Sequence, residues 1–182
     1  QVTIVVPFVP GGLPDSNARY MAQRLAPRLG QPVVVDNRPG AGTNIGMNVV
    51  ARAAPDGYTV GLASIAANAA NKWLYRNLPF DPERDFAAVG MIALVPNIVV
   101  IPPAVPARNL PEFIAWARAQ NRPMNFGSVG AGSSQHLAGS QFQVITGLPM
   151  QHLPYTNGGQ MNTDLIEGRI DMLFQSISAV AQ

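Results

Sequence analysis

Short runs of β-branched, apolar residues alternate along this chain with longer stretches in which apolar residues recur every three or four positions. The short runs are typical of buried strands, and the three-to-four spacing is typical of helices with one buried face. Pro27 should disturb the last turn of the first of these helices, which is expected at 14–29. The alternating order indicates an α/β fold with a mostly parallel sheet covered by helices. In the first half the pattern predicts strands at 2–6, 33–35 and 58–63, and helices at 14–29, near 43–53 and after 64–71.

The composition changes after the apolar runs 89–94 and 97–101, because four prolines then follow between 102 and 111. Such a change favours a domain boundary, and we therefore predict a first domain at 1–100 and a second at 101–182. The pattern in the second domain predicts strands at 124–126, 150–153 and 170–174, and helices at 110–119 and ending near 146 and 166.

Composition excludes several classes of protein. With 182 residues, 47% hydrophobic residues, 12% charged residues and no cysteine, the chain is neither a disordered tail nor a disulfide-stapled mini-protein, and it has no thiol nucleophile. Its 12 basic residues are spread along the sequence, so no nucleic-acid partner is expected. The apolar runs are too short to cross a membrane. The chain opens on a strand-like segment, and we expect that any export signal has been removed or never existed.

Two loops rich in glycine and serine could bind an anion. The first contains Gly11 and Gly12, and the second runs through 130–134. Each precedes a predicted helix, whose N-terminus presents unpaired N–H groups and a favourable dipole to a carboxylate or phosphate. The plainer alternative is that these glycines only permit turns with positive φ. The spacing in the second loop is G-x-x-G-x-G, which does not match a nucleotide fingerprint, and no cofactor is therefore expected.

The side chains that could carry catalysis do not form a recognisable set. No serine lies in a G-x-S-x-G motif. His136, just inside a helix, is interpreted as a capping or packing residue that could line a pocket, and His152 as structural. Two histidines without a motif also predict no metal site. Among the carboxylates, Asp15 fits a first helical turn, Asp164 and Glu167 a solvated helix face, and Asp171 a turn. Donor-rich loops without a nucleophile-base pair favour binding over catalysis, so we predict no enzyme.

Several blocks of this sequence resemble the Bug family, the periplasmic receptors of tripartite tricarboxylate transporters. The most specific are Arg38-Pro39-Gly40-Ala41-Gly42 and Pro55-Asp56-Gly57-Tyr58-Thr59. The match extends in the right order over nearly the whole chain. Its further blocks are 4–12 with Asp15, 30–37, 44–46, 51–53, 78–82 with 85–86, 125–128 with 130–133, 136–139, 154–155 and 163–165.

The resemblance implies a two-lobed, type II periplasmic-binding-protein fold that closes on a small organic carboxylate held by backbone amides, small hydroxyls and ordered waters. It also implies a periplasmic monomer that works with the membrane components of a transporter, without a cofactor or metal. Members of the family continue beyond the position of Gln182, so we expect the segments that complete the first lobe to be missing. The ligand-binding residues implied are Phe8, Gly11, Gly12, Asp15, Ser64 and Asn68 in the first lobe, and Ser128, Gly130, Gly132, Ser133, His136 and Tyr155 in the second.

Two departures from the family pattern leave the ligand open. Asn157-Gly158-Gly159 stands where members commonly carry a Lys-Gly stretch, and Leu13-Pro14 replaces the usual small residues. A lyase or hydrolase acting on an anion, or a sensory module, remain alternatives. Neither Lys nor Arg occurs at 2–17, 64–71 or 125–136, so we predict binding through N–H and hydroxyl donors, with Ser128→Ala weakening it by about tenfold.

Overall fold

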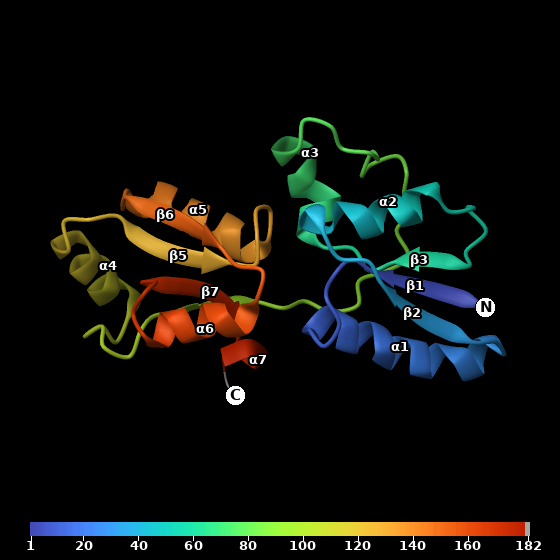
Figure 1. Cartoon of the computed structure of the whole chain (residues 1–182), viewed down its shortest axis with the longest axis horizontal. Helices are drawn as coiled ribbons and strands as arrows, with labels where there is room; N and C mark the ends of the chain where they lie inside the picture. The colour runs from blue at the N-terminus through green and yellow to red at the C-terminus, as the bar shows by residue number, and fades with distance from the viewer. Residues whose placement is uncertain (181–182) are drawn as a thin grey trace. The chain divides into compact units, whose positions relative to one another are not determined.

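The computed structural model describes residues 1–180 and divides the chain into two compact units, Gln1–Ala93 and Leu94–Gln182. Each unit has its own sheet with helices packed on it (Figure 1). Within the described residues, the first sheet has three strands and the second has four. The predicted α/β class with mostly parallel strands is confirmed in both units.

The sheet of the first unit has the order β2-β1-β3, and both pairings are parallel. Strand β1 lies in the centre because its run of apolar residues can be covered on both faces. Ile4 and Val6 pack against Ala18 and Ala22 of helix α1 and form the core of this unit. The elements are β1 (Val2–Val6), α1 (Leu13–Leu29), β2 (Val33–Asn37), the 3₁₀ turn η1 (Ala41–Thr43), α2 (Asn44–Arg52), β3 (Thr59–Gly61), the π-helical turn η2 (Ala66–Ala70) and α3 (Asn71–Leu74).

Helix α1 continues through Pro27 instead of being disturbed there. A proline this close to a helix end removes only one hydrogen bond, and the helix still ends on Gly30, whose left-handed backbone (φ 62°) lets its amide donate to the Ala26 carbonyl. Strand β2 is longer than predicted, because Asp36 and Asn37 continue the pairing with β1. Strand β3 is shorter than predicted.

The sheet of the second unit has the order β4-β7-β5-β6, with β4 antiparallel to β7 and the other pairs parallel. Phe113, Phe126 and Met172 are almost completely buried and lie in its main core, which joins α4 and α5 to the sheet. The elements are β4 (Asn97–Val100), α4 (Leu110–Ala119), β5 (Met124–Ser128), α5 (Ser134–Thr146), β6 (Met150–Pro154), α6 (Gly158–Ile166), β7 (Met172–Ser176) and α7 (Ile177–Val180).

The boundary between the units lies at 93/94, not at the predicted 100/101. The difference arises from β4, whose residues pair with β7 and therefore belong to the second sheet. Composition alone does not show which sheet a strand joins. The apolar run 89–94 forms no strand in the described structure, and Val89 and Leu94 are 91% and 84% exposed.

Candidate functional site

The predicted ligand-binding residues follow the carboxyl ends of parallel strands. In open α/β sheets this edge is where ligands bind. In the first unit, Phe8–Gly12 follows β1, and Ser64 and Asn68 follow β3. In the second unit, the loop from Ser128 to Ser133 joins β5 to α5, and Tyr155 follows β6. Each unit is considered by itself below.

Ser128 is fully buried, and its hydroxyl is used within the β5–α5 loop. The hydroxyl accepts from the Gly130 amide (3.1 Å), contacts the Gly130 carbonyl (3.1 Å) and lies 2.6 Å from His152 Nε2. The hydroxyl donates to the Gly130 carbonyl, and its remaining lone pair then accepts from His152 in the neutral tautomer that carries its proton on Nε2. Ser128 therefore holds the Gly130 turn, where φ is 127°, and its buried hydroxyl is not exposed as a donor for a ligand.

Ser133 and His136 complete this internal network. Ser133 is the N-cap of α5: its hydroxyl donates to the Gly130 carbonyl (2.7 Å) and accepts from the His136 amide (3.2 Å). The Gly132 amide donates to His136 Nδ1 at 3.2 Å, which requires that nitrogen to be unprotonated. Among the described residues, the amides of Ala131, Ser134 and Gln135 have no hydrogen-bond partner, and they are the donors left for an anion. Sequence reasoning indicated the N–H groups of the loop 130–134, but it did not name these three residues among the ligand-binding ones.

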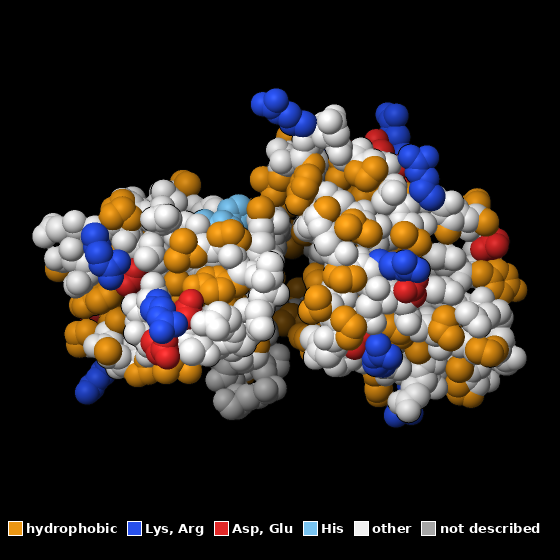
Figure 2. Space-filling model, in the orientation of Figure 1, with side chains coloured by type: hydrophobic (Ala, Val, Ile, Leu, Met, Phe, Trp, Pro, Cys, Tyr) orange, Lys and Arg blue, Asp and Glu red, His pale blue; other side chains and the backbone are white. Residues whose placement is uncertain are grey.

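The two histidines lie together, with ring centroids 4.3 Å apart, and both contact Phe126. Figure 2 shows histidine side chains at the surface of the second unit. Burial lowers the pKa of each imidazole, and the neighbouring His136 lowers the pKa of His152 further. No sequence pattern indicated the contact between Ser128 and His152, which arises because β5 and β6 are adjacent. The serine is nevertheless buried and already bonded to Gly130, so it is not an available nucleophile.

Tyr155 and Asp164 form a second polar group in this unit. The Tyr155 hydroxyl donates to Asp164 Oδ2 at 2.7 Å, and Asp164 also accepts from Gln160 and Arg169. Burial, and then the Asp164 carboxylate, raise the pKa of Tyr155 to about 12. The bond from Tyr155, followed by those from Arg169 and Gln160, lowers the pKa of Asp164. The prediction that Asp164 lies on a solvated helix face was therefore wrong, because its side chain is mostly buried and bonded. The Tyr155 hydroxyl is likewise already engaged within the unit.

Asp171 lies in the bend directly before β7, as interpreted, but its side chain also makes bonds that this interpretation did not include. It is 4% exposed, makes two hydrogen bonds with Arg122 at 2.7 and 2.8 Å, and accepts from the Asn125 amide at 2.7 Å. These bonds tie the start of β7 to β5 at the amino end of the sheet. The sequence separation of 49 residues between Asp171 and Arg122 hides this pair from any local motif.

In the first unit, Asp15 anchors the loop after β1. Its carboxylate accepts from the Gly11 amide, Arg19 Nε and Asn37 Nδ2, each at 2.9 Å, and Asn37 also donates to the Phe8 carbonyl. The bond from Arg19, and then those from Gly11 and Asn37, lower the pKa of Asp15 to about 2. Asp15 is thus the first-turn residue that was predicted, and its own carboxylate occupies the Gly11 amide.

Buried oxygen atoms without a hydrogen-bond partner in residues 1–180 occur in the loop after β3 and in other segments of the first unit. Ser64 Oγ has no hydrogen bond within the described residues, and neither do Thr43 Oγ1 and Asn71 Oδ1. Asn68 is exposed within the π-helical turn η2. Gly12 begins helix α1 with an extended backbone. Sequence reasoning proposed Ser64 and Asn68 but missed Asn71, which no short motif marks.

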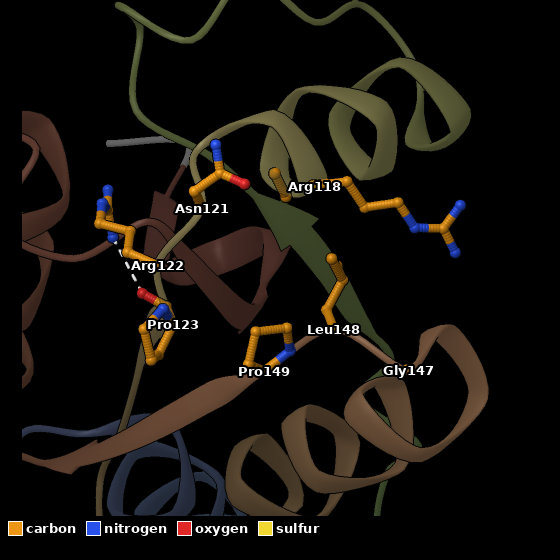
Figure 3. Close-up of a pocket in the computed structure, with 8 residues that line it drawn as sticks. Arg118, Asn121, Arg122, Pro123, Gly147, Leu148 and Pro149 are labelled. Atoms are coloured by element: carbon orange, nitrogen blue, oxygen red, sulfur yellow. Dashed lines mark hydrogen bonds between the residues drawn. The ribbon is translucent and has the colours of Figure 1, made fainter.

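A shallow hollow of about 300 Å³ lies elsewhere, at the amino ends of β5 and β6 (Figure 3). Figure 3 shows Pro149 and Leu148 beside it, while Arg118 and Arg122 extend away. Arg122 is bonded to Asp171, and Arg118 donates to the Thr146 carbonyl. The arginines are therefore engaged elsewhere, and this hollow is not suited to a carboxylate. Within residues 1–180, no cluster of three metal-ligating side chains occurs, and no helix has the length and apolar character needed to span a bilayer.

Residues 17–182 match the family described as tripartite tricarboxylate transporter family receptor. The chain is 34% identical to a protein of Pseudomonas sp. strain P51 from the tcbD–tcbE intergenic region, over 100% of this chain and 54% of that protein. It is 36% identical to protein BugT of Bordetella pertussis, over 100% of this chain and 56% of BugT. The chain thus spans about half the length of the curated relatives it matches.

Solved structures agree with this family. An R. palustris protein solved with adipate is similar with a TM-score of 0.88 and 37% identity, and MatC from Rhodopseudomonas palustris with bound malate has a TM-score of 0.83 and 29% identity. The periplasmic binding protein BugD has a TM-score of 0.76 and 31% identity. The chain covers 58–60% of these three structures, and they cover 96–98% of it.

These neighbours are binding proteins and receptors, not enzymes, which agrees with the expectation drawn from donor-rich loops without a nucleophile-base pair. The α/β architecture of periplasmic binding proteins is likewise the one that the motifs implied. The chain therefore belongs to the tripartite tricarboxylate transporter receptor family, as its resemblance to the Bug proteins predicted.

Proposed function

We propose that this chain carries out ligand capture for a periplasmic receptor, which binds a small organic carboxylate and delivers it to the membrane components of a tripartite tricarboxylate transporter. The family match and the neighbours solved with adipate and malate support this proposal. The observation that carries it is the N-terminus of α5, where three amides have no partner among the described residues. That no cation occurs at 125–136 agrees with binding by amides.

The proposed chemistry is a set of hydrogen bonds to an ionised carboxylate. Ala131, Ser134 and Gln135 donate their N–H groups, and the dipole of the 13-residue helix α5 favours the negative charge. A hydrogen bond to a charged group contributes about 1.5–3 kcal/mol, so a few such donors support roughly micromolar affinity after ordering costs. We propose that Gly12, Ser64 and Asn68 contribute contacts to the ligand from the first unit. The two loops themselves are shaped by the other predicted residues, which are Phe8, Gly11, Asp15, Ser128, Gly130, Gly132, Ser133, His136 and Tyr155.

A single substitution can delete one of these amides. Ser134 is the first residue of α5, where proline is well tolerated, and the preceding Ser133 already has the extended backbone (φ −62°, ψ 156°) that proline requires of its neighbour. Ser134→Pro should therefore keep the fold and weaken carboxylate binding by about tenfold, as calorimetric titration with adipate and malate would measure. Ser134→Ala, which keeps the amide, is the matched control and should stay within about twofold.

The ligand class needs its own comparison. Adipate and malate should bind, and the corresponding diamides, which lack the negative charge, should bind at least about tenfold more weakly. If no carboxylate in a panel of mono-, di- and tricarboxylates binds to the folded protein, the proposal fails. Delivery can be tested separately from binding, by asking whether the immobilised protein captures a membrane subunit of the transporter from a membrane fraction.

A further inference from the structure

Asn71 is a buried polar residue of the first unit that the proposed ligand contacts do not include. It is 0% exposed and lies at the junction between the π-helical turn η2 and helix α3. Its Nδ2 group donates to the Gly42 carbonyl at 2.7 Å and to Asn44 Oδ1 at 2.6 Å. Because a carbonyl oxygen only accepts, the Gly42 contact fixes which end of the Asn71 amide faces that turn.

The turn that Asn71 holds is strained. Ala41 and Thr43 have φ values of 46° and 80°, in the left-handed region that residues with a side chain rarely adopt. Thr43 is β-branched, which makes this conformation less favourable still. Such a backbone persists only where the surrounding structure holds it, and strained segments of this kind are concentrated at functional sites. The two hydrogen bonds from Asn71 connect this turn and the adjoining Asn44 to the segment that follows β3.

Asn71 is also joined directly to the segment that carries Ser64 and Asn68. Its backbone amide donates to the Ala66 carbonyl and closes the π-helical turn, and the Asn68 amide donates to the Ser64 carbonyl at 2.9 Å. Single π-turns are frequent at functional sites. The side chain and the backbone of one buried residue therefore link residues 42–44 to residues 64–68. Asp at position 71 would lack both donors, and Leu would fill the space without making either bond.

We propose that Asn71 is a positioning residue, which fixes the Ser64–Asn68 segment for carboxylate binding by fastening it to the strained turn at 41–43. The proposal rests on the proposed function, because the segment that it positions is one that we assign to the ligand. The fastening itself is a property of the protein without ligand, so it can be tested separately.

The first test is hydrogen exchange of the ligand-free protein. In Asn71→Leu, the amides at 41–44 and 64–70 should exchange at least about tenfold faster, while those of β1 and α1 keep their rates. Phe80→Leu is the matched control, since Phe80 packs with Met47 and Ala67 under the same segment but makes no polar contact with the turn. It should lower the melting temperature without selectively speeding exchange at 41–44.

The second test is ligand affinity in the folded variants. Asn71→Leu should weaken adipate or malate binding by about tenfold, and Asn44→Ala, which removes one of the two acceptors, by a smaller factor. The double variant should bind no more weakly than Asn71→Leu, because both changes break the same connection. Unchanged exchange at 41–44 in Asn71→Leu, or equal exchange and affinity losses in Phe80→Leu, would overturn the proposal. If the unaltered protein binds no carboxylate, the proposed function fails, while the exchange result still decides the role of Asn71.

Discussion

At the scale of single residues, the polar side chains of the β5–α5 loop mainly bind one another. Ser128 and Ser133 both contact the Gly130 carbonyl, and His136 accepts from the Gly132 amide. These bonds fix the two turns with positive φ at Gly130 and Gly132. The loop is consequently preorganised, and its hydroxyls shape the proposed site while backbone amides remain free to donate.

Ser128→Ala should therefore act through the loop and not through a lost ligand contact. The change leaves the Gly130 amide and His152 Nε2 without their shared partner in a buried place, which costs about 1–3 kcal/mol of unfolding free energy. Carboxylate affinity should fall by about tenfold as the Gly130 turn relaxes. Urea denaturation and calorimetric titration measure the two effects. Weakened binding at unchanged stability would instead indicate that Ser128 contacts the ligand directly.

The histidines should make the stability of the protein depend on pH. Burial lowers the pKa of both below the ordinary value of 6.5 in the folded protein. As the pH falls, the histidines of the unfolded chain are therefore protonated at a higher pH than those of the folded protein. The contribution of the two histidines to the free energy of unfolding should be complete above pH 6.5. It should decrease as the pH falls through 6.5 toward their pKa values in the folded protein. The lowered pKa values of Asp15 and Asp164 act in the same direction, but only near and below 3.8.

Denaturation at pH about 7.5, 6.5 and 5.5 would measure this effect. His136→Gln should reduce the loss of stability between these values, because it removes one of the two titrating groups. Protonation of His136 also removes the acceptor of the Gly132 amide, so carboxylate affinity should weaken over the same range. Stability that rises on acidification across this range would contradict the assignment of two neutral imidazoles.

At the scale of elements, opposite ends of the second sheet have different roles. The carboxyl ends of β5 and β6 carry the proposed ligand loop and Tyr155, whereas at the amino end Asp171 and Arg122 tie β7 to β5. Asp171 is buried and Arg122 is half exposed, so the pair is only partly screened by water. Substitutions at the two ends should consequently separate stability from binding.

Asp171→Asn should destabilise the protein by about 2 kcal/mol, because it weakens the bonds to Arg122 and to the Asn125 amide. Carboxylate affinity of the folded variant should stay within about twofold, since the change lies at the edge remote from the ligand loop. Arg38→Ala is the control: its partner Asp36 is on the surface, and the expected cost is at most about 1 kcal/mol. An equal loss of stability in both variants would argue against the Asp171 connection.

At the scale of the whole molecule, we expect charge to be a minor contributor to carboxylate binding. The net charge is +2, and the basic residues lie outside the proposed ligand loops. Arg19, which comes close to the loop after β1, is paired with Asp15. Binding by amides and a helix N-terminus should therefore respond less to salt than binding by an arginine or lysine would.

Carboxylate affinity should change by less than about threefold between roughly 50 and 500 mM sodium chloride. Calorimetry at several salt concentrations, with ionic strength the only variable, measures this dependence. A loss of about tenfold or more would point to a direct contact with a cationic side chain, and Arg19→Gln would then be the first variant to examine.

Local patterns were sufficient to predict most of the fold and the family. The strands and helices follow from apolar spacing, because burial of one face requires that spacing whatever the partner, and α4 and α5 end at the predicted residues. The glycine and serine loops also indicated an anion site, since the conformations and donors of a helix N-terminus depend on neighbouring residues. The family motifs, which are contiguous stretches, could likewise be identified without coordinates.

The tertiary structure decided which groups are free. Ser128 meets His152, Asp171 meets Arg122, and Asn71 meets Gly42, at separations of 24, 49 and 29 residues. Strand order sets these encounters, and no local spacing encodes it: β4 joined the second sheet for the same reason. A hydrogen-bond donor serves a ligand only if no neighbour in the fold has already taken it. The sequence thus determined the kind of site that we propose, and the packing of distant segments determined which of its atoms remain free to bind.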